Sequence, residues 1–247
     1  MASKAFAIVA GVGPGTGAAC ARRFAKAYPV VLMARNPDNY EGLVQEINKS
    51  GGKAIGISTD VSSVESVDAA FAKIKAEYKD AACAAAVFNA SGRFARGPLL
   101  EMKVEDFVGS WDVSCKGALI FAQHALPLLL KHADDSSAKH PPTLIFTGAT
   151  ASVKANAQMS GFACAKFALR ALSTSIAKEF APKGVHVAHA VIDGVIDIPA
   201  TKNWLKDQPH EAKIGADDIA ESYWNLHTQS KRCFTNEIDI RPMYEKW

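Results

Sequence analysis

The sequence lacks the features that would place it in several classes of protein at once. Charge of one sign is not in excess, because 28 lysines and arginines stand against 25 aspartates and glutamates, spread along the chain with a net charge of +3. Without a basic block that could follow a phosphate backbone, nucleic acid is not expected as a partner. The five cysteines are scattered, with neither CxxC pairs nor the framework of a secreted disulfide protein, which predicts a reducing compartment.

Long hydrophobic runs and metal-binding patterns are also missing. No apolar stretch reaches the roughly 20 residues that span a bilayer. The first residues, MASKAFAIVAG, have neither the length nor the cleavage site of a signal peptide. The seven histidines show no HExxH or HxxxH spacing. We therefore expect a cytoplasmic protein that needs no membrane and no metal.

Short apolar runs alternate with amphipathic, helical segments along the whole chain. Uniformly apolar runs are typical of strands buried in a parallel sheet. The six runs are Ala5–Ala10, Val30–Ala34, Ala54–Ser58, Ala84–Asn89, Thr143–Thr147 and Val185–Ile192. A last run, Thr235–Ile240, alternates like an edge strand. This order predicts an α/β fold with a doubly wound parallel sheet, the Rossmann fold, in a single domain over residues 1–247. The irregular stretch 193–215 is predicted to be a substrate lid.

A glycine-rich stretch joins the first predicted strand to the first predicted helix. It reads GVGPGTG and contains Gly11, Gly13, Pro14, Gly15, Thr16 and Gly17. Glycine permits a tight turn and lets backbone amides approach a pyrophosphate, which the N-terminus of a helix also attracts. So many glycines also fit a plain turn, but the strand before and the helix after favour dinucleotide binding.

The residues after the second predicted strand distinguish the two nicotinamide dinucleotides. A carboxylate at this place accepts a hydrogen bond from the ribose 2′-OH and repels a 2′-phosphate, but the run is VVLMARN, without an acid. Arg35 offers a fork of donors suited to phosphate, with Asn36 beside it. NADP(H) is therefore the predicted cofactor. The alternative is an arginine that only faces solvent.

Four landmarks occur in the order of one known family. They are the spacing Gly11-xxx-Gly15-x-Gly17, the pair Asp60-Val61, the run Asn89-Ala90-Ser91-Gly92, and Lys166 in a long helical segment. On these landmarks nearly the whole chain resembles the short-chain dehydrogenase/reductase family.

The resemblance implies a role for each matching residue. Asp60 and Val61 would border the adenine, and Asn89, followed by Ala90 and Ser91, would steady the central strand beside the cofactor. Lys166 would bind the nicotinamide ribose, and the backbone of Ile196 would meet the carboxamide. Asp60 and Asn89 are also ordinary turn-forming residues, and that role is compatible with a cofactor contact.

The catalytic residues of the family are not all present. The family uses a Tyr-x-x-x-Lys pair, whose members share one helix face so that the lysine lowers the tyrosine pKa. Here GFACAK places Phe162 at the tyrosine position, and a phenyl ring has no proton to exchange. The expected serine, thirteen residues earlier, is Ala149, and the expected asparagine is Ser114. Hydroxyl groups close to Ala149 in the sequence are the alternative donors if the loop geometry differs, and these are Thr147, Thr150 and Ser152. Lys166 and Ser114 remain as the catalytic candidates.

Three functions are open on this basis. The first is reduction of a substrate that needs no tyrosine proton, such as an iminium ion, an enone or an enoyl group. The second is carbonyl reduction with another acid, for which the candidates by position are Ser114, Ser160, Cys164 and Arg93. The third is a non-redox catalytic or regulatory role of a cofactor-binding protein. Because the cofactor-facing groups remain, the sequence favours an NADP(H)-dependent reductase of a small organic substrate.

Assembly is expected from the resemblance alone. Family members commonly pair through two long helices and form dimers or tetramers. In this chain the corresponding segments are Val104–Lys131 and Asn156–Phe180. The resemblance therefore implies a homodimer or homotetramer that binds a small-molecule substrate.

Overall fold

The computed structural model describes residues 5–94 and 96–246, and a seven-stranded sheet runs through its centre. The strands are β1 (Ala5–Ala10), β2 (Val30–Ala34), β3 (Ala54–Ser58), β4 (Ala82–Phe88), β5 (Thr143–Thr147), β6 (His186–Ile192) and β9 (Glu237–Ile240). All neighbours pair in parallel, in the order β3-β2-β1-β4-β5-β6-β9. The predicted doubly wound parallel sheet is confirmed, and the last predicted strand is its edge.

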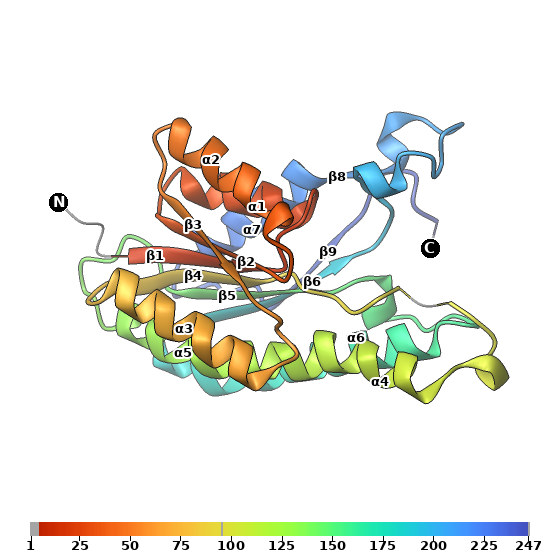
Figure 1. Ribbon diagram of the computed structural model, residues 1–247, viewed down its shortest axis with the longest axis horizontal. Coiled ribbons are helices and arrows are strands. Elements are labelled where there is room, and N and C mark those ends of the chain that lie inside the picture. The colour runs from red at the N-terminus through yellow and green to blue at the C-terminus, as the bar shows by residue number, and fades with distance from the viewer. Residues whose placement is uncertain (1–4, 95, 247) are drawn as a thin grey trace.

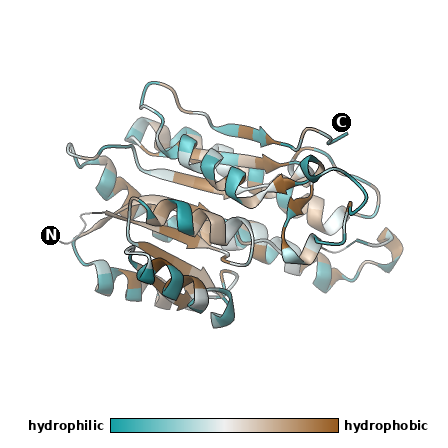
Figure 2. Cartoon of the chain, turned by 90° about the horizontal axis from the view of Figure 1, so that it is seen from above, coloured by the Kyte–Doolittle hydropathy of each residue, from teal (hydrophilic) through white to brown (hydrophobic). Residues whose placement is uncertain are grey.

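Helices cover both faces of this sheet (Figure 1). On one face lie α1 (Thr16–Ala25), α2 (Glu41–Lys49) and α7 (Ala216–His227). On the other lie α3 (Val64–Tyr78), α4 (Val104–Trp111), α5 (Gly117–Ala133) and α6 (Ser160–Phe180). Figure 2 shows apolar strands between helices with hydrophilic outer surfaces.

Each face of the sheet has its own apolar core. Within β1, Phe6 and Ile8 belong to the core under α3 and α5, whereas Ala7 and Val9 belong to the core under α1 and α7. Successive side chains of a strand point to opposite faces. Burial on both faces therefore requires every position to be apolar, which is the physical reason for the unbroken runs in the sequence.

The predicted lid stretch forms a small substructure of its own. β7 (Ile196–Asp197) pairs in parallel with β8 (Ile214–Gly215), and two 3-10 turns, Pro199–Thr201 and His210–Ala212, lie between them. This substructure lies beside the carboxyl ends of the strands (Figure 1).

One segment is longer and more apolar than we expected from the sequence. Val104–Ala133, which comprises α4, a π-type turn at Asp112–Lys116 and α5, is long and apolar enough by length and composition to cross a membrane. The expectation that no stretch would reach this limit was wrong. Half of its most apolar window is buried inside the fold, where Phe121 and Leu129 are wholly covered. Packing against the sheet accounts for the apolar character of the segment.

Buried histidines make the fold sensitive to acid. His132, His186, His189 and His227 are all buried. Loss of solvation disfavours the charged imidazolium and lowers the pKa of each, to about 4 for His189 and to about 3 for His227. The unfolded chain takes up these protons near pH 6.5, and the folded chain only at lower pH. The stability gained from the neutral rings is therefore complete above pH 6.5 and is lost as the pH falls toward 3.

We predict that the free energy of unfolding falls by about 3 kcal/mol between pH 7 and pH 5. Urea unfolding at the two pH values measures the difference. His227→Gln should reduce this pH dependence, because the variant has no buried imidazole at that position. His210→Gln, at an exposed position, should leave it unchanged. Equal stability at pH 7 and pH 5 would contradict the prediction.

Candidate active site

A cavity of about 840 Å³ lies at the carboxyl ends of β1, β4, β5 and β6. A second hollow, of about 670 Å³, continues past the end of β2. The two share Gly11, Asn89 and Ser91 in their walls. Strand order reverses between β1 and β4, and ligands of doubly wound sheets bind in the crevice at such a switch point.

The glycine loop is packed too closely for larger residues at two of its positions. Gly11 has a φ of +87°, and a Cβ there would lie 2.3 Å from the backbone nitrogen of Ala90. A Cβ on Gly17 would lie 2.5 Å from the carbonyl oxygen of Gly11. Asn89 Nδ2 donates to this oxygen at 2.9 Å. The loop after β4 therefore holds the glycine loop against the first turn of α1.

The start of α1 fits an anionic ligand. The first turn of the helix contains no acidic residue, and no side chain caps it. Thr16 is buried, and its Oγ1 has no hydrogen-bond partner among the described residues. Unpaired donors at a helix N-terminus are suited to phosphate. The residues present here thus fit the pyrophosphate of a dinucleotide.

The second hollow contains the residues predicted for the adenosine end. Arg35 is exposed at its edge. Asn36 caps the 3-10 turn Pro37–Asn39 by accepting from the Asp38 backbone N–H at 3.1 Å. Asp60 Oδ1 accepts from the hydroxyl and the backbone N–H of Ser62, and these bonds hold the pKa of Asp60 below its usual value. Asp60 is therefore a turn residue that also faces the hollow.

Lys166 is buried in the wall of the larger cavity. Its Nζ donates to the Thr147 carbonyl oxygen at 3.0 Å, at the end of β5. Burial lowers the pKa of Lys166 to about 8. An ammonium group has three donors, so two remain for a ligand. The Phe162 ring centroid lies 5.7 Å from this nitrogen.

The wall beside Lys166 is apolar where the family places hydroxyl groups. Phe162 packs in one cluster with Ala149, Ala151 and Ala163, and the Phe94 ring meets it edge-on at a centroid distance of 5.3 Å. Neither Phe162 nor Ala149 has a side-chain proton to donate. Among the described residues, Phe162 and the alanines packed on it therefore contribute no side-chain acid to the cavity wall.

The candidate stand-in acids lie elsewhere. Ser114 is fully buried in the π-type turn, and its Oγ accepts from the Gly92 backbone N–H at 3.0 Å. Ser160 and Cys164 face a different hollow on the outer side of α6. Within the described part of the chain, the cavity wall includes none of these three, nor Arg93.

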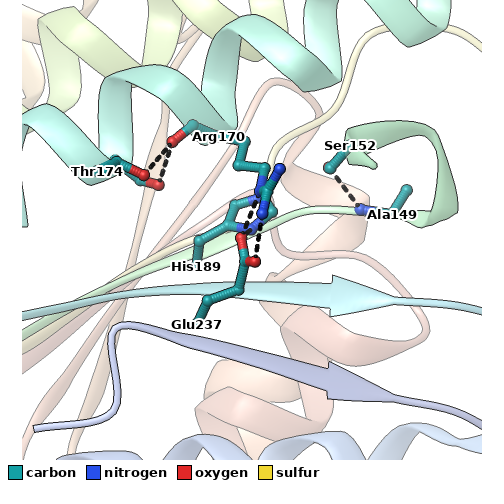
Figure 3. A network of polar contacts seen from close by, with 7 residues as sticks. Ala149, Ser152, Arg170, Thr174, His189 and Glu237 are labelled. Atoms are coloured by element: carbon teal, nitrogen blue, oxygen red, sulfur yellow. Dashed lines mark hydrogen bonds and ion pairs between the residues drawn. The ribbon is translucent and has the colours of Figure 1, made fainter. Parts of the chain in front are cut away.

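A network of polar contacts connects α6, β6 and β9 (Figure 3), in which His189 is buried and Arg170 and Glu237 are partly exposed. His189 on β6 contacts Glu237 Oε2 through Nδ1 at 3.0 Å, and Arg170 of α6 binds both oxygens of the same carboxylate at 2.6 and 2.7 Å. A Cβ on Gly148 would lie 2.3 Å from His189 Nε2. Glycine is therefore required at the point where the chain leaves β5.

A second polar cluster lies at the cavity itself, and its first member is one of the hydroxyl residues close to Ala149 in the sequence. Thr150 lines the cavity and donates from Oγ1 to Asp193 Oδ1 at 2.5 Å. Arg241 contacts the other oxygen of Asp193 at 3.1 Å. The one signal for Asp193 in the sequence was that it stands where the resemblance leads one to expect proline.

The comparisons agree with this architecture. A family model described as short chain dehydrogenase matches residues 5–209. An uncharacterized oxidoreductase of Staphylococcus epidermidis is 29% identical over 238 residues, which cover 96% of each chain. The crystal structure of a short-chain dehydrogenase from Rhodopseudomonas palustris superposes with a TM-score of 0.78 and 30% identity over 97% of this chain and 99% of the other. A metagenomic short-chain oxidoreductase in complex with NADP gives a TM-score of 0.79 and 24% identity over 98% and 99%.

Proposed function

The chain belongs to the short-chain dehydrogenase family, and from this premise we propose that it is an NADP(H)-dependent oxidoreductase of a small organic substrate. The family uses nicotinamide cofactors, and one observation supports the proposal above the others. Every residue predicted from the sequence to bind the cofactor lines one of the two adjoining hollows. Residues from six separate parts of the chain thus meet along one crevice.

Arg35 supports the phosphorylated form of the cofactor. Arg35 follows β2 directly, is exposed, and lines the second hollow, which contains the residues predicted for the adenosine end. A guanidinium binds phosphate through paired, charge-assisted hydrogen bonds. The metagenomic structural neighbour was solved with NADP, which is compatible with the same preference here.

Each part of the site has a task when the cofactor binds. The glycine loop and Thr16 would hold the pyrophosphate, Lys166 the nicotinamide ribose, and the backbone of Ile196 the carboxamide. The cofactor would supply or accept the hydride. Several residues of the predicted lid line the cavity, among them Ile198, Thr201 and Trp204, and would exclude water from it.

Arg35→Ala tests the cofactor preference. Loss of a charge-assisted phosphate contact is expected to weaken NADPH binding about ten-fold or more and to leave NADH binding nearly unchanged. Fluorescence titration with each nucleotide measures both affinities. Lys49→Ala, which removes an exposed cation from the end of α2, is the matched control. Equal binding of the two nucleotides by the unmodified protein would refute the role given to Arg35.

Turnover tests the activity itself. Single-turnover NADPH oxidation against a panel of imines, enones and ketones, and NADP⁺ reduction against alcohols, separate a hydride-transferring enzyme from a non-redox protein. Binding of NADPH without turnover in either direction would favour the non-redox function. Absence of binding of either nucleotide would refute the proposal entirely.

Assembly and compartment are parts of the same proposal. We expect a homodimer or homotetramer through α4, α5 and α6, whose outer faces expose large apolar side chains. These are Val104, Val108, Trp111, Leu119 and Phe167. Light scattering coupled to size exclusion measures the assembly. All five cysteines are free thiols, in keeping with a reducing, cytoplasmic environment.

A further inference from the structure

Hydride transfer at a carbinol or carbonyl carbon is accompanied by transfer of a proton, and the family's tyrosine and serine positions are Phe162 and Ala149 in this chain. When an alcohol is oxidised, its carbon loses a hydride and its oxygen must lose a proton to a base. Phe162 and Ala149 offer no base. Thr150, however, lies in the sequence between Ala149 and Ala151, two of the alanines that pack with Phe162. It is the first residue of the 3-10 turn Thr150–Ser152 and part of the cavity wall.

The hydroxyl of Thr150 is oriented by a carboxylate. Its single proton is directed to Asp193 Oδ1 at 2.5 Å, a distance typical of a charge-assisted O–H···O⁻ bond. A hydroxyl that donates its proton in this way still has two lone pairs with which to accept another. Thr150 Oγ1 is thus a hydrogen-bond acceptor at the wall of the cavity, backed by a base.

The carboxylate of Asp193 lies in a cluster of charged side chains. Asp193 follows β6 and is 6% exposed, so its charge requires a partner. Arg241 supplies that partner at 3.1 Å, but the same guanidinium also binds both oxygens of Asp239 at 2.7 Å. Glu245 lines the cavity and interacts electrostatically with the same guanidinium. Three carboxylates therefore share one guanidinium. The cluster has an excess of negative charge, and this favours uptake of a proton.

We propose that Thr150 and Asp193 act together as the proton acceptor of this site and that the enzyme oxidises a secondary alcohol. This rests on the proposed function and sets its direction. A bound oxidised nicotinamide would accept the hydride that leaves the carbinol carbon. The substrate O–H bond would break at the same time, and a new O–H bond would form at Thr150 Oγ1. The original Thr150 proton passes to Asp193 Oδ1. The products are a ketone, the reduced nucleotide and a protonated Asp193, which returns its proton to solvent.

The same contacts have a purely structural alternative. Asp193 and Thr150 also connect the turn after β5 to Arg241 near the end of the chain, and such a tether would stabilise the cavity without exchanging protons. The two roles differ in what the hydroxyl of Thr150 must do, because a tether acts on stability and a proton acceptor acts on the rate of the reaction.

The test uses the full chain with NADP⁺ and three alcohols: 2-propanol, cyclohexanol and 1-phenylethanol. Thr150→Val and Asp193→Asn are expected to lower kcat for oxidation ~10²–10³-fold, with little change in KM, NADP⁺ affinity or melting temperature. Thr150→Ser keeps the hydroxyl and should keep most of the activity. Thr174→Val, an exposed threonine on α6, is the control for the change from threonine to valine. Asp239→Asn removes a different partner of Arg241 and should lower kcat far less than Asp193→Asn.

A spectroscopic measurement adds a readout that a tether would not change. Mixing the enzyme–NADP⁺ complex with alcohol should produce the infrared band of a protonated carboxyl group, and this band should be missing in Asp193→Asn. Full activity of Thr150→Val, or equal losses in the Asp193 and Asp239 variants, would overturn the proton-acceptor role. The proton-acceptor role would also be overturned if the protein binds NADP⁺ and reduces imines or enones but oxidises no alcohol. That result would leave the proposed function intact. Failure to bind either nucleotide would refute both the proton-acceptor role and the proposed function.

Discussion

Replacing Gly11 with alanine is expected to lower the melting temperature by ~10 °C or more and to abolish measurable nucleotide binding. The φ of +87° alone costs an alanine about 1–2 kcal/mol. The added Cβ would also lie 2.3 Å from the nitrogen and 2.5 Å from the Cα of Ala90. These are backbone atoms, which cannot rotate away, and the chain beside them is fixed by the bond from Asn89 N–H to the Ala10 carbonyl oxygen at 2.8 Å. Differential scanning fluorimetry and NADPH fluorescence measure the two effects.

Gly13→Ala is the matched control in the same loop. No heavy atom lies within 4 Å of a Cβ built on Gly13, and its φ is outside the left-handed region. The variant should keep the melting temperature of the unmodified protein to within about 2 °C. Because Gly13 lines the cavity, only its stability serves as the control. Equal stability of the Gly11 and Gly13 variants would show that the loop does not pack against the chain after β4.

Phe162→Tyr combined with Ala149→Ser is expected to raise the rate of ketone reduction by ~10²–10⁴-fold. The tyrosine hydroxyl would enter the cavity wall next to Lys166, whose Nζ already lies 5.7 Å from the Phe162 ring centroid. A buried ammonium beside a phenol favours the phenolate and so lowers the pKa of the tyrosine. Single-turnover NADPH oxidation with a panel of ketones measures the gain in each single variant and in the double variant.

Phe167→Tyr provides the control for an added phenolic hydroxyl. Phe167 lies on the exposed side of α6, and the described cavity wall does not include it. This variant should not change the rate. No gain in the double variant of Phe162 and Ala149, with NADPH still bound, would mean that the cavity does not present a ketone to the nicotinamide.

The bounds of several strands could be taken from the sequence directly. β1, β2, β3 and β5 begin and end at the predicted residues, because burial on both faces makes a parallel strand apolar at every position and turn residues interrupt the run. β4 begins two residues before the prediction and ends one residue before it. The segment Val104–Ala133 meets the length and composition of a spanning helix, contrary to the expectation from the sequence, because composition alone cannot distinguish a core helix from a spanning one.

The two parts of the candidate site differed in how well they could be predicted. The cofactor crevice is built from short local motifs at the ends of successive strands, and a parallel sheet brings those ends to one edge by its topology. The proton-handling groups are not local. Thr150 and Asp193 are 43 residues apart, and no spacing rule connects them. Among the stand-in groups chosen from the sequence, Ser114, Ser160 and Cys164 are directed elsewhere, whereas Thr150, one of the hydroxyl residues close to Ala149, lines the cavity.

The sequence by itself determined the layered α/β fold, the phosphate-binding turn and the absence of a tyrosine hydroxyl at Phe162. Each of these depends on residue type and on neighbours within a few positions. Only the tertiary structure decided which polar side chains reach the cavity. It placed Thr150 in the wall, bonded to Asp193, which Arg241 contacts in turn. Side-chain direction at a strand end depends on how three separate segments pack together, and local sequence does not contain that information.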